Sequence, residues 1–191
     1  MMKHLPQTYE NIENDVIALF PFLIRGSIEC DYNHIDAFIQ LTGDTIDIKQ
    51  PSVTSTTVDE SGNAKLAWAI TVISDTGEPG ALLSDVKYFG LTNLYKDRAT
   101  NVTTCKDNKD PWLFLLERTD IMSLLSYTTY DTFKQFTNTE PTMNYLNETF
   151  NFSRERGIYF QRNFRGTAKY FIIVTEDFIK TWPKQFYYLA K

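Results

Sequence analysis

The sequence predicts a mixed α/β fold of the α+β type, with a central mixed β-sheet flanked by helices. Three observations predict it. Apolar residues recur at helical spacing over residues 8–20. Two strand-like runs separated by turn residues follow within 27–50. A second strand pair occupies residues 158–175. This order of elements is typical of a sheet against which helices pack.

The predicted first helix, residues 8–20, begins near Thr8. Pro21 ends it, because proline lacks the amide that a helix needs and disfavours helical backbone in the residue before it. The apolar stripe of this helix consists of Ile12, Val16, Leu19 and Phe20.

The next element is a predicted β-hairpin made of residues 27–40 and 45–50. Its strands are joined by the sequence LTGD at 41–44, in which Gly43 can adopt the positive φ that a tight turn requires. Residues 51–63 read as a loop and 64–73 as a further strand.

The middle of the chain is less regular. Residues 81–95 could form a helix followed by a strand, or two short strands, while the polar residues 96–111 predict a surface excursion. Residues 112–120 read as a buried strand, with 121–130 as its continuation or hairpin partner.

Towards the end, residues 129–136 predict a short helix, and the polar residues 138–157 show few apolar stripes of helical length. A hairpin then turns at Arg165 and Gly166, and a helical turn over 176–182 is ended by Pro183.

The length of 191 residues suits one domain with a full hydrophobic core. An apolar content of 42% and a charged content of 23% are typical of a globular chain. No run approaches the roughly 18 apolar residues that span a bilayer, and the acidic N-terminal segment does not resemble a secretory signal. We therefore expect a cytoplasmic protein without a membrane partner. Cys30 and Cys105 stand in no metal-binding or disulfide pattern, so we expect free thiols.

Charge is unevenly distributed along the chain. The net charge is −5, yet residues 154–191 carry +5 and the remainder −10. Basic side chains alternate with aromatic ones in this segment, a composition suited to gripping a nucleic-acid backbone. The alternative is that the aromatic residues are core and the basic ones simply face water. The candidate nucleic-acid-binding residues are Arg154, Arg156, Arg162, Arg165 and Lys169.

The first hairpin brings charged residues together. Alternation along a strand sets Asp47 and Lys49 on one face and buries the isoleucines beside them on the other. If residues 41–44 form the loop, Asp36 lies opposite Lys49 and Phe38 opposite Asp47, so the two carboxylates are diagonal neighbours roughly 7 to 8 Å apart. A slip of one residue would turn Asp36 into the core.

Two carboxylates at this separation suit Mg²⁺, for which Mn²⁺ can substitute, because Mg²⁺ prefers hard oxygen ligands and retains waters and phosphate oxygens. Asp36 and Asp47 are the candidate ligands, and the backbone carbonyl of Ile48 is a further one. Lys49 could orient or deprotonate the attacking water and neutralise charge that develops on the phosphate. Together these groups predict hydrolysis of a phosphodiester.

An acid before a hairpin, followed by Asp47-Ile48-Lys49 in an apolar strand, resembles the PD-(D/E)XK nuclease superfamily. The likeness covers about the first 70 residues, and the motif is similar to those of phage and mobile-element nucleases and of Holliday-junction-resolvase-like members. Ile35 stands where the family usually has proline. The resemblance implies that Glu10 or Glu13, on the preceding helix, completes the metal site.

It also implies a restriction-endonuclease-like fold and a Mg²⁺-dependent endodeoxyribonuclease acting on duplex or branched DNA. The expected organisation is a single nuclease-like domain over 1–191, with a catalytic core near 8–95 and a basic, aromatic hairpin and helix at 154–191. Such a protein could be a homodimer. The alternatives are an RNA-cleaving member of the superfamily and a non-catalytic interaction protein, either an inhibitor or a subunit of a DNA-processing, defence or anti-defence assembly.

Overall fold

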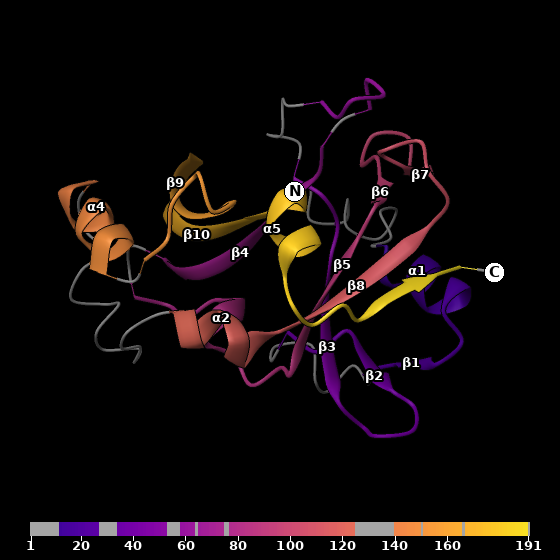
Figure 1. Cartoon of the computed structure of the whole chain (residues 1–191). Helices are drawn as coiled ribbons and strands as arrows, with labels where there is room; N and C mark the ends of the chain where they lie inside the picture. The colour runs from indigo at the N-terminus through magenta and orange to yellow at the C-terminus, as the bar shows by residue number, and fades with distance from the viewer. Residues whose placement is uncertain are drawn as a thin grey trace, which may run out of the picture.

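The computed structural model describes residues 12–26, 34–52, 58–63, 65–74, 77–124, 140–149, 151–165 and 167–190. Its largest sheet has six strands (Figure 1). β3 and β5 are parallel and all the other neighbours antiparallel, so the sheet is mixed, as predicted. In spatial order the strands are β1 (Leu23–Arg25), β2 (Ala37–Ile39), β3 (Thr45–Lys49), β5 (Tyr88–Thr92), β8 (Trp112–Glu117) and β11 (Tyr187–Leu189).

A second, antiparallel sheet has three strands, in the order β4 (Ala67–Ser74), β10 (Thr167–Thr175) and β9 (Ile158–Arg165). The hairpin of β9 and β10 confirms the strand pair predicted near the end of the chain. A smaller two-stranded sheet consists of β6 (Leu94–Lys96) and β7 (Thr103–Cys105).

The two faces of the large sheet are covered differently. The helix α1 (Glu13–Leu19) lies on one face, where buried Ile12, Val16 and Phe20 pack with Ile46 and Ile48. This arrangement confirms a helix with the predicted apolar stripe, although the helix is shorter than predicted because it begins at Glu13. Residues 8–11 of the predicted helix lie outside the described residues.

The second sheet covers much of the other face, and α5 (Glu176–Thr181) adds to the same core. Trp68 of β4 meets Trp112 of β8 edge to face, with ring centroids 5.8 Å apart. The indole nitrogen of Trp68 also donates to the Thr92 carbonyl at 3.0 Å. The expectation of helices on the sheet therefore holds fully for the α1 face and only in part for the opposite face, where β4 and β10 supply many of the apolar side chains.

The remaining helical elements are η3 (Ala81–Leu83), α2 (Arg118–Leu124), α4 (Glu140–Thr149) and α5 (Glu176–Thr181). α5 begins at Thr175, whose side-chain oxygen accepts from the amide of Phe178 at 3.3 Å, as an N-cap does. It confirms the helical turn predicted at 176–182. None of the helices within the described ranges is long and apolar enough to cross a membrane.

Three sequence-based assignments differ from the structure. Residues 121–124 belong to α2 and do not continue the buried strand, which ends at Glu117. Residues 140–149 form a helix although their apolar stripe is short. The surface excursion at 96–111 contains β7. Residues 81–95 form a 3-10 turn and two strands, so the second alternative there is the closer one. The helix predicted at 129–136 lies outside the described residues.

Candidate functional site: a buried carboxyl cluster on β2, β3 and α1

The hairpin of β2 and β3 has a different register from the predicted one. Phe38 pairs with Thr45 and Ala37 with Ile46. The turn does contain Gly43 in a positive-φ conformation, at +75°. The predicted pairing of Asp36 with Lys49 and of Phe38 with Asp47 is therefore wrong by two residues, because the loop begins one residue earlier than LTGD. A shift of two preserves the faces of a strand, so Asp47 and Lys49 still share the predicted face.

Asp36 lies just before the first residue of β2. Its amide donates to the carbonyl of Ile46 at 2.9 Å, although Ala37 is the registered partner of Ile46. Two residues of one strand thus face a single residue of the other, as in a β-bulge, a feature that re-aims side chains and is common beside active sites.

The side chain of Asp36 continues the hydrogen bonding between β2 and β3 beyond the first residue of β2. Its Oδ2 accepts from the amide of Ile48 at 2.7 Å. The carbonyl of Ile48 leaves β3 on the same side as this amide, since both groups of one residue face the same neighbouring strand in an antiparallel ladder. The Ile48 carbonyl, a predicted metal ligand, is therefore directed to the edge at which Asp36 lies.

Three carboxyl groups meet at this edge. The Asp36 carboxyl is within hydrogen-bonding range of both Glu13, on α1, and Asp47, on β3. Burial, reinforced by the negative charges of Asp47 and Glu13, raises the pKa of Asp36 to about 9. Burial also raises the pKa of Glu13. Asp36 is therefore protonated at neutral pH and can donate its proton to either neighbour.

Asp47 is the most enclosed strand residue of the cluster, with a relative exposure of 4%. Lys49 Nζ lies 3.2 Å from Asp47 Oδ2, an ion pair whose angles do not make a hydrogen bond. The two residues share the face that the sequence predicted, opposite to that of Ile46 and Ile48. Lys49 contacts Asp47 and does not face Asp36.

Glu13, Asp36 and Asp47 have the chemistry of a divalent-cation site. Glu13 Oε2 and Asp47 Oδ2 are buried without a hydrogen-bond partner, and carboxylate oxygens are ligands that Mg²⁺ prefers. In their present arrangement the carboxyls interact with one another, and within the described residues no group of three Asp, Glu, His or Cys side chains is set to hold a metal ion. A cation here would require these side chains to turn from one another towards a shared point.

Two further charged residues bear on this site, one predicted from the sequence and one not. Glu10, the alternative helix acid, lies outside the described residues. Arg25, on β1, was missed by the sequence-based reasoning. It pairs with Ala37 in the sheet, its side chain donates to Asn14 on α1, and its charge acts on Glu13. Only the three-residue strand β1 brings it there, and no motif marks so short a strand.

The predicted nucleic-acid-binding residues lie elsewhere. Figure 1 places β9 and β10 at one end of the molecule and α1, β1 and β2 at the other. The structure therefore does not bring the basic strand and the carboxyl cluster together. Arg154 and Arg156 precede β9, Arg162 lies within it, and Arg165 is its last residue. Lys169 is an exposed residue of β10.

Two of these arginines make cation–π contacts with aromatic rings of the second sheet. The guanidinium of Arg154 lies 4.3 Å from the ring centroid of Tyr159, and that of Arg162 lies 5.4 Å from the centroid of Tyr170. Arg156 donates to the carbonyl of Asn151 at 2.7 Å. These contacts order the side chains, and binding of nucleic acid by them stays a prediction.

No family model, curated protein or solved structure matches this chain.

Proposed function

We propose that this chain is a metal-dependent deoxyribonuclease with a restriction-endonuclease-like arrangement of its large sheet and α1. One observation carries the proposal: Glu13, Asp36 and Asp47, from three separate elements, meet at one partly buried edge beside Lys49. Three desolvated carboxyls repel one another when ionised, so such a cluster is costly to the fold unless a cation compensates it.

Mg²⁺ or Mn²⁺ would be held by Asp36, Asp47 and the Ile48 carbonyl, with Glu13 assisting, and would supply charge neutralisation at the phosphate and an acidified water. The residues of the chain perform the other tasks. The ammonium of Lys49, held at 3.2 Å by Asp47, orients the attacking water and stabilises negative charge on the phosphate oxygens. The Asp36 side chain, fixed by the Ile48 amide, keeps the edge of β3 in place.

The direct test is cleavage by the purified chain with Mg²⁺ or Mn²⁺, using supercoiled, linear, single-stranded and branched DNA, with RNA in parallel. We expect Asp47→Ala to lower the rate of DNA cleavage by on the order of 10³-fold, since it removes a predicted ligand and the partner of Lys49. Asp44→Ala is the matched control, because Asp44 lies in the turn of the same hairpin and pairs with Lys87 at 3.7 Å.

The control should cleave within about threefold of the unaltered protein, and both variants should retain the far-ultraviolet circular dichroism of the fold. Absence of cleavage of every substrate, or an unchanged rate in Asp47→Ala, would contradict the proposal and leave the non-catalytic interaction protein as the better explanation. Cleavage of RNA alone would replace the deoxyribonuclease by the ribonuclease alternative.

A further inference from the structure

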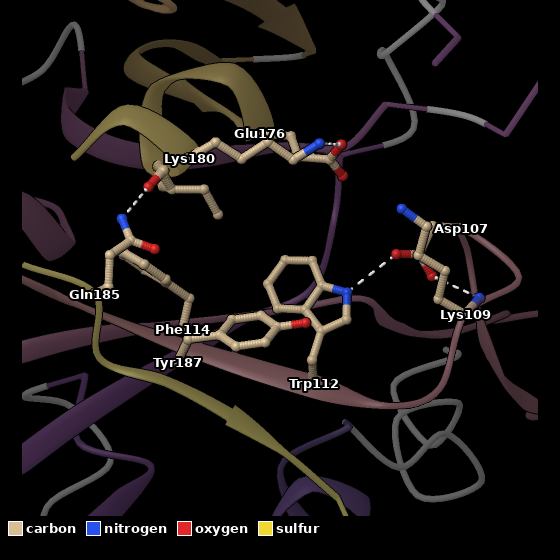
Figure 2. Close-up of a pocket in the computed structure, with 9 residues that line it drawn as sticks. Asp107, Lys109, Trp112, Phe114, Glu176, Lys180, Gln185 and Tyr187 are labelled. Carbon is tan, nitrogen blue, oxygen red and sulfur yellow. Dashed lines mark hydrogen bonds and ion pairs between the residues drawn. The ribbon is translucent and has the colours of Figure 1, made fainter. Parts of the chain in front are cut away.

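A second recess, separate from the carboxyl cluster, lies between α5 and the strands β8 and β11 (Figure 2). Its volume is about 240 Å³, enough for a small planar ligand. The loop after β7 closes one side of it, through Asp107 and Lys109. Figure 2 shows the rings of Trp112 and Tyr187 on one wall and the side chains of Glu176 and Lys180 on the opposite wall.

The first wall is aromatic. The ring centroids of Trp112 and Tyr187 are 5.6 Å apart with an interplanar angle of 39°, and Phe114 also lines the recess. Tyr187 retains an exposure of 47% although it stands on a strand of the central sheet. An aromatic surface that is partly open to solvent at the wall of a recess is suited to stacking against a flat ring.

The opposite wall offers hydrogen-bond acceptors. Glu176 is a buried carboxylate with 4% exposure, and its Oε2 forms an ion pair with Lys180 Nζ at 3.0 Å. Gln185 uses its side-chain nitrogen to donate to the Ile179 carbonyl at 2.8 Å. Within the described residues, no hydrogen bond engages Glu176 Oε1 or Gln185 Oε1, so both oxygens can accept from a ligand.

Asp107 plays a different part from Glu176. Its Oδ1 accepts from the side chain of Asn93 at 2.8 Å and its Oδ2 from the indole of Trp112 at 3.0 Å. These bonds fix the orientation of the Trp112 ring and leave Asp107 as a supporting residue. The mouth of the recess carries the ammonium groups of Lys109 and Lys180, whose side chains are 49% and 57% exposed and which form ion pairs with Asp59 at 3.8 Å and with Glu176 at 3.0 Å.

We propose that this recess binds a nucleobase that carries an exocyclic amino group, as adenine, cytosine and guanine do. The rings of Trp112 and Tyr187 stack on the base, and Glu176 and Gln185 accept hydrogen bonds from its amino group and, in guanine, from the ring N1–H as well. The lysines at the mouth neutralise the attached phosphate. The base can belong to a free nucleotide or to an unpaired position of a DNA strand, and in the second case the inference rests on the proposed nuclease function.

The sheet itself relates this recess to the carboxyl cluster. Lys49, Leu91, Phe114 and Tyr187 are successive partners across β3, β5, β8 and β11, so their side chains lie on one face of the sheet. Three strand spacings separate Tyr187 from Lys49, roughly 14 Å. Because Leu91 and Phe114 between them are buried, the recess is a separate site on the face that bears Lys49.

The test is binding in EDTA, which excludes metal-dependent cleavage. Ligand-observed saturation-transfer NMR and fluorescence titration are run with dAMP, dCMP, dGMP and dTMP, and with tetranucleotides of A, C and T. We expect the amino-bearing bases to bind about 5- to 150-fold more tightly than thymine. Tetranucleotides that bind more tightly than the mononucleotides identify a DNA strand as the source of the base, and equal affinities identify a free nucleotide.

Tyr187→Ala should weaken binding by about 5- to 150-fold, the range for removal of one stacked base. Glu176→Gln, which keeps the shape of the side chain, should reduce the preference over thymine. Tyr188→Ala is the matched control. Tyr188 is the next residue of β11, points to the other face and packs on Phe22 with centroids 4.5 Å apart, so its replacement should leave binding unchanged.

Absence of binding by any nucleotide, equal binding of thymine, or unchanged binding by Tyr187→Ala overturns the proposal. The nuclease function is judged separately by Asp47→Ala, which should bind nucleotides normally in EDTA while losing cleavage. Cleavage without nucleotide binding would therefore overturn only the proposed nucleobase site. Nucleotide binding without cleavage would overturn only the proposed nuclease function.

Discussion

The burial and neighbouring charges that raise the pKa of Asp36 also lower the stability of the fold at neutral pH. Burial and the charges of Asp47 and Glu13 raise its pKa to about 9 from an ordinary value of 3.8. Between these two values the folded protein binds a proton that the unfolded chain has released. The free energy of unfolding therefore falls as the pH rises from about 4 towards 9, and the raised pKa of Glu13 acts in the same direction.

Asp36→Asn should remove most of this dependence. Asparagine keeps an oxygen for the Ile48 amide and presents a permanent donor to Glu13 and Asp47, as the protonated acid does. At pH 7 in EDTA we expect the variant to be more stable by about 1–3 kcal/mol, with a flatter slope of unfolding free energy against pH. Urea unfolding at pH 5, 7 and 9 measures both quantities. An unchanged slope would mean that Asp36 is ionised in the folded protein.

Arg25 is the cation that the fold places beside the carboxyl cluster without any motif to mark it. Arg25→Ala should weaken DNA binding, and the salt dependence of log K should become shallower by about 0.9 for each phosphate that the variant no longer neutralises. Fluorescence anisotropy with duplex DNA at several salt concentrations measures this effect. The same measurement on Arg154→Ala tests the sequence-based prediction for the basic strand. An unchanged salt slope in Arg25→Ala would exclude Arg25 from the DNA interface.

At the level of elements, α1 delivers Glu13 to an edge that β2 and β3 build. The sequence predicted this helix because its stripe of Ile12, Val16, Leu19 and Phe20 repeats at helical spacing over about two turns. It also predicted the hairpin and the shared face of Asp47 and Lys49, since Gly43 and the period of two are local signals. The pairing register was missed, because a glycine marks a turn without specifying which residue begins the loop.

The elements that the sequence did not predict depend on distant partners. β1 and β11 have three residues each and exist as strands by pairing with β2 and β8. α2 begins directly after a buried strand, where apolar residues suit either structure. Both missed strands matter to function, since β1 carries Arg25 and β11 carries Tyr187.

Val16→Ala tests whether α1 positions Glu13. Val16 is fully buried against the sheet, one turn after Glu13. The removal of two methyl groups should lower the free energy of unfolding by about 1–3 kcal/mol and reduce cleavage, because α1 then holds Glu13 less firmly. Ala18→Ser, at an exposed position of the same helix, should change stability by less than about 0.5 kcal/mol. Full cleavage by a destabilised Val16→Ala would show that Glu13 is dispensable.

Across the whole molecule, the two larger sheets share one core. Side chains from β4, β5, β8 and β10 pack in a single cluster, and Trp68 joins the sheets through its contacts with Trp112 and Thr92. The carboxyl cluster lies at an edge of the large sheet, where Glu13 of α1 joins Asp36 and Asp47. A cation bound at this edge would therefore stabilise a structure that extends through both sheets.

We accordingly predict one cooperative unfolding transition that shifts as a whole with Mg²⁺. Tryptophan fluorescence reports on the shared core, because Trp68 and Trp112 are buried, and far-ultraviolet circular dichroism reports on all strands and helices. The two signals should coincide in urea. Mg²⁺ at 100 times its Kd should add about 2.7 kcal/mol to the free energy of unfolding, and excess EDTA should remove this increment. Asp47→Ala should show no increment. Separate transitions, with only one responding to Mg²⁺, would mean that the second sheet folds independently of the metal site.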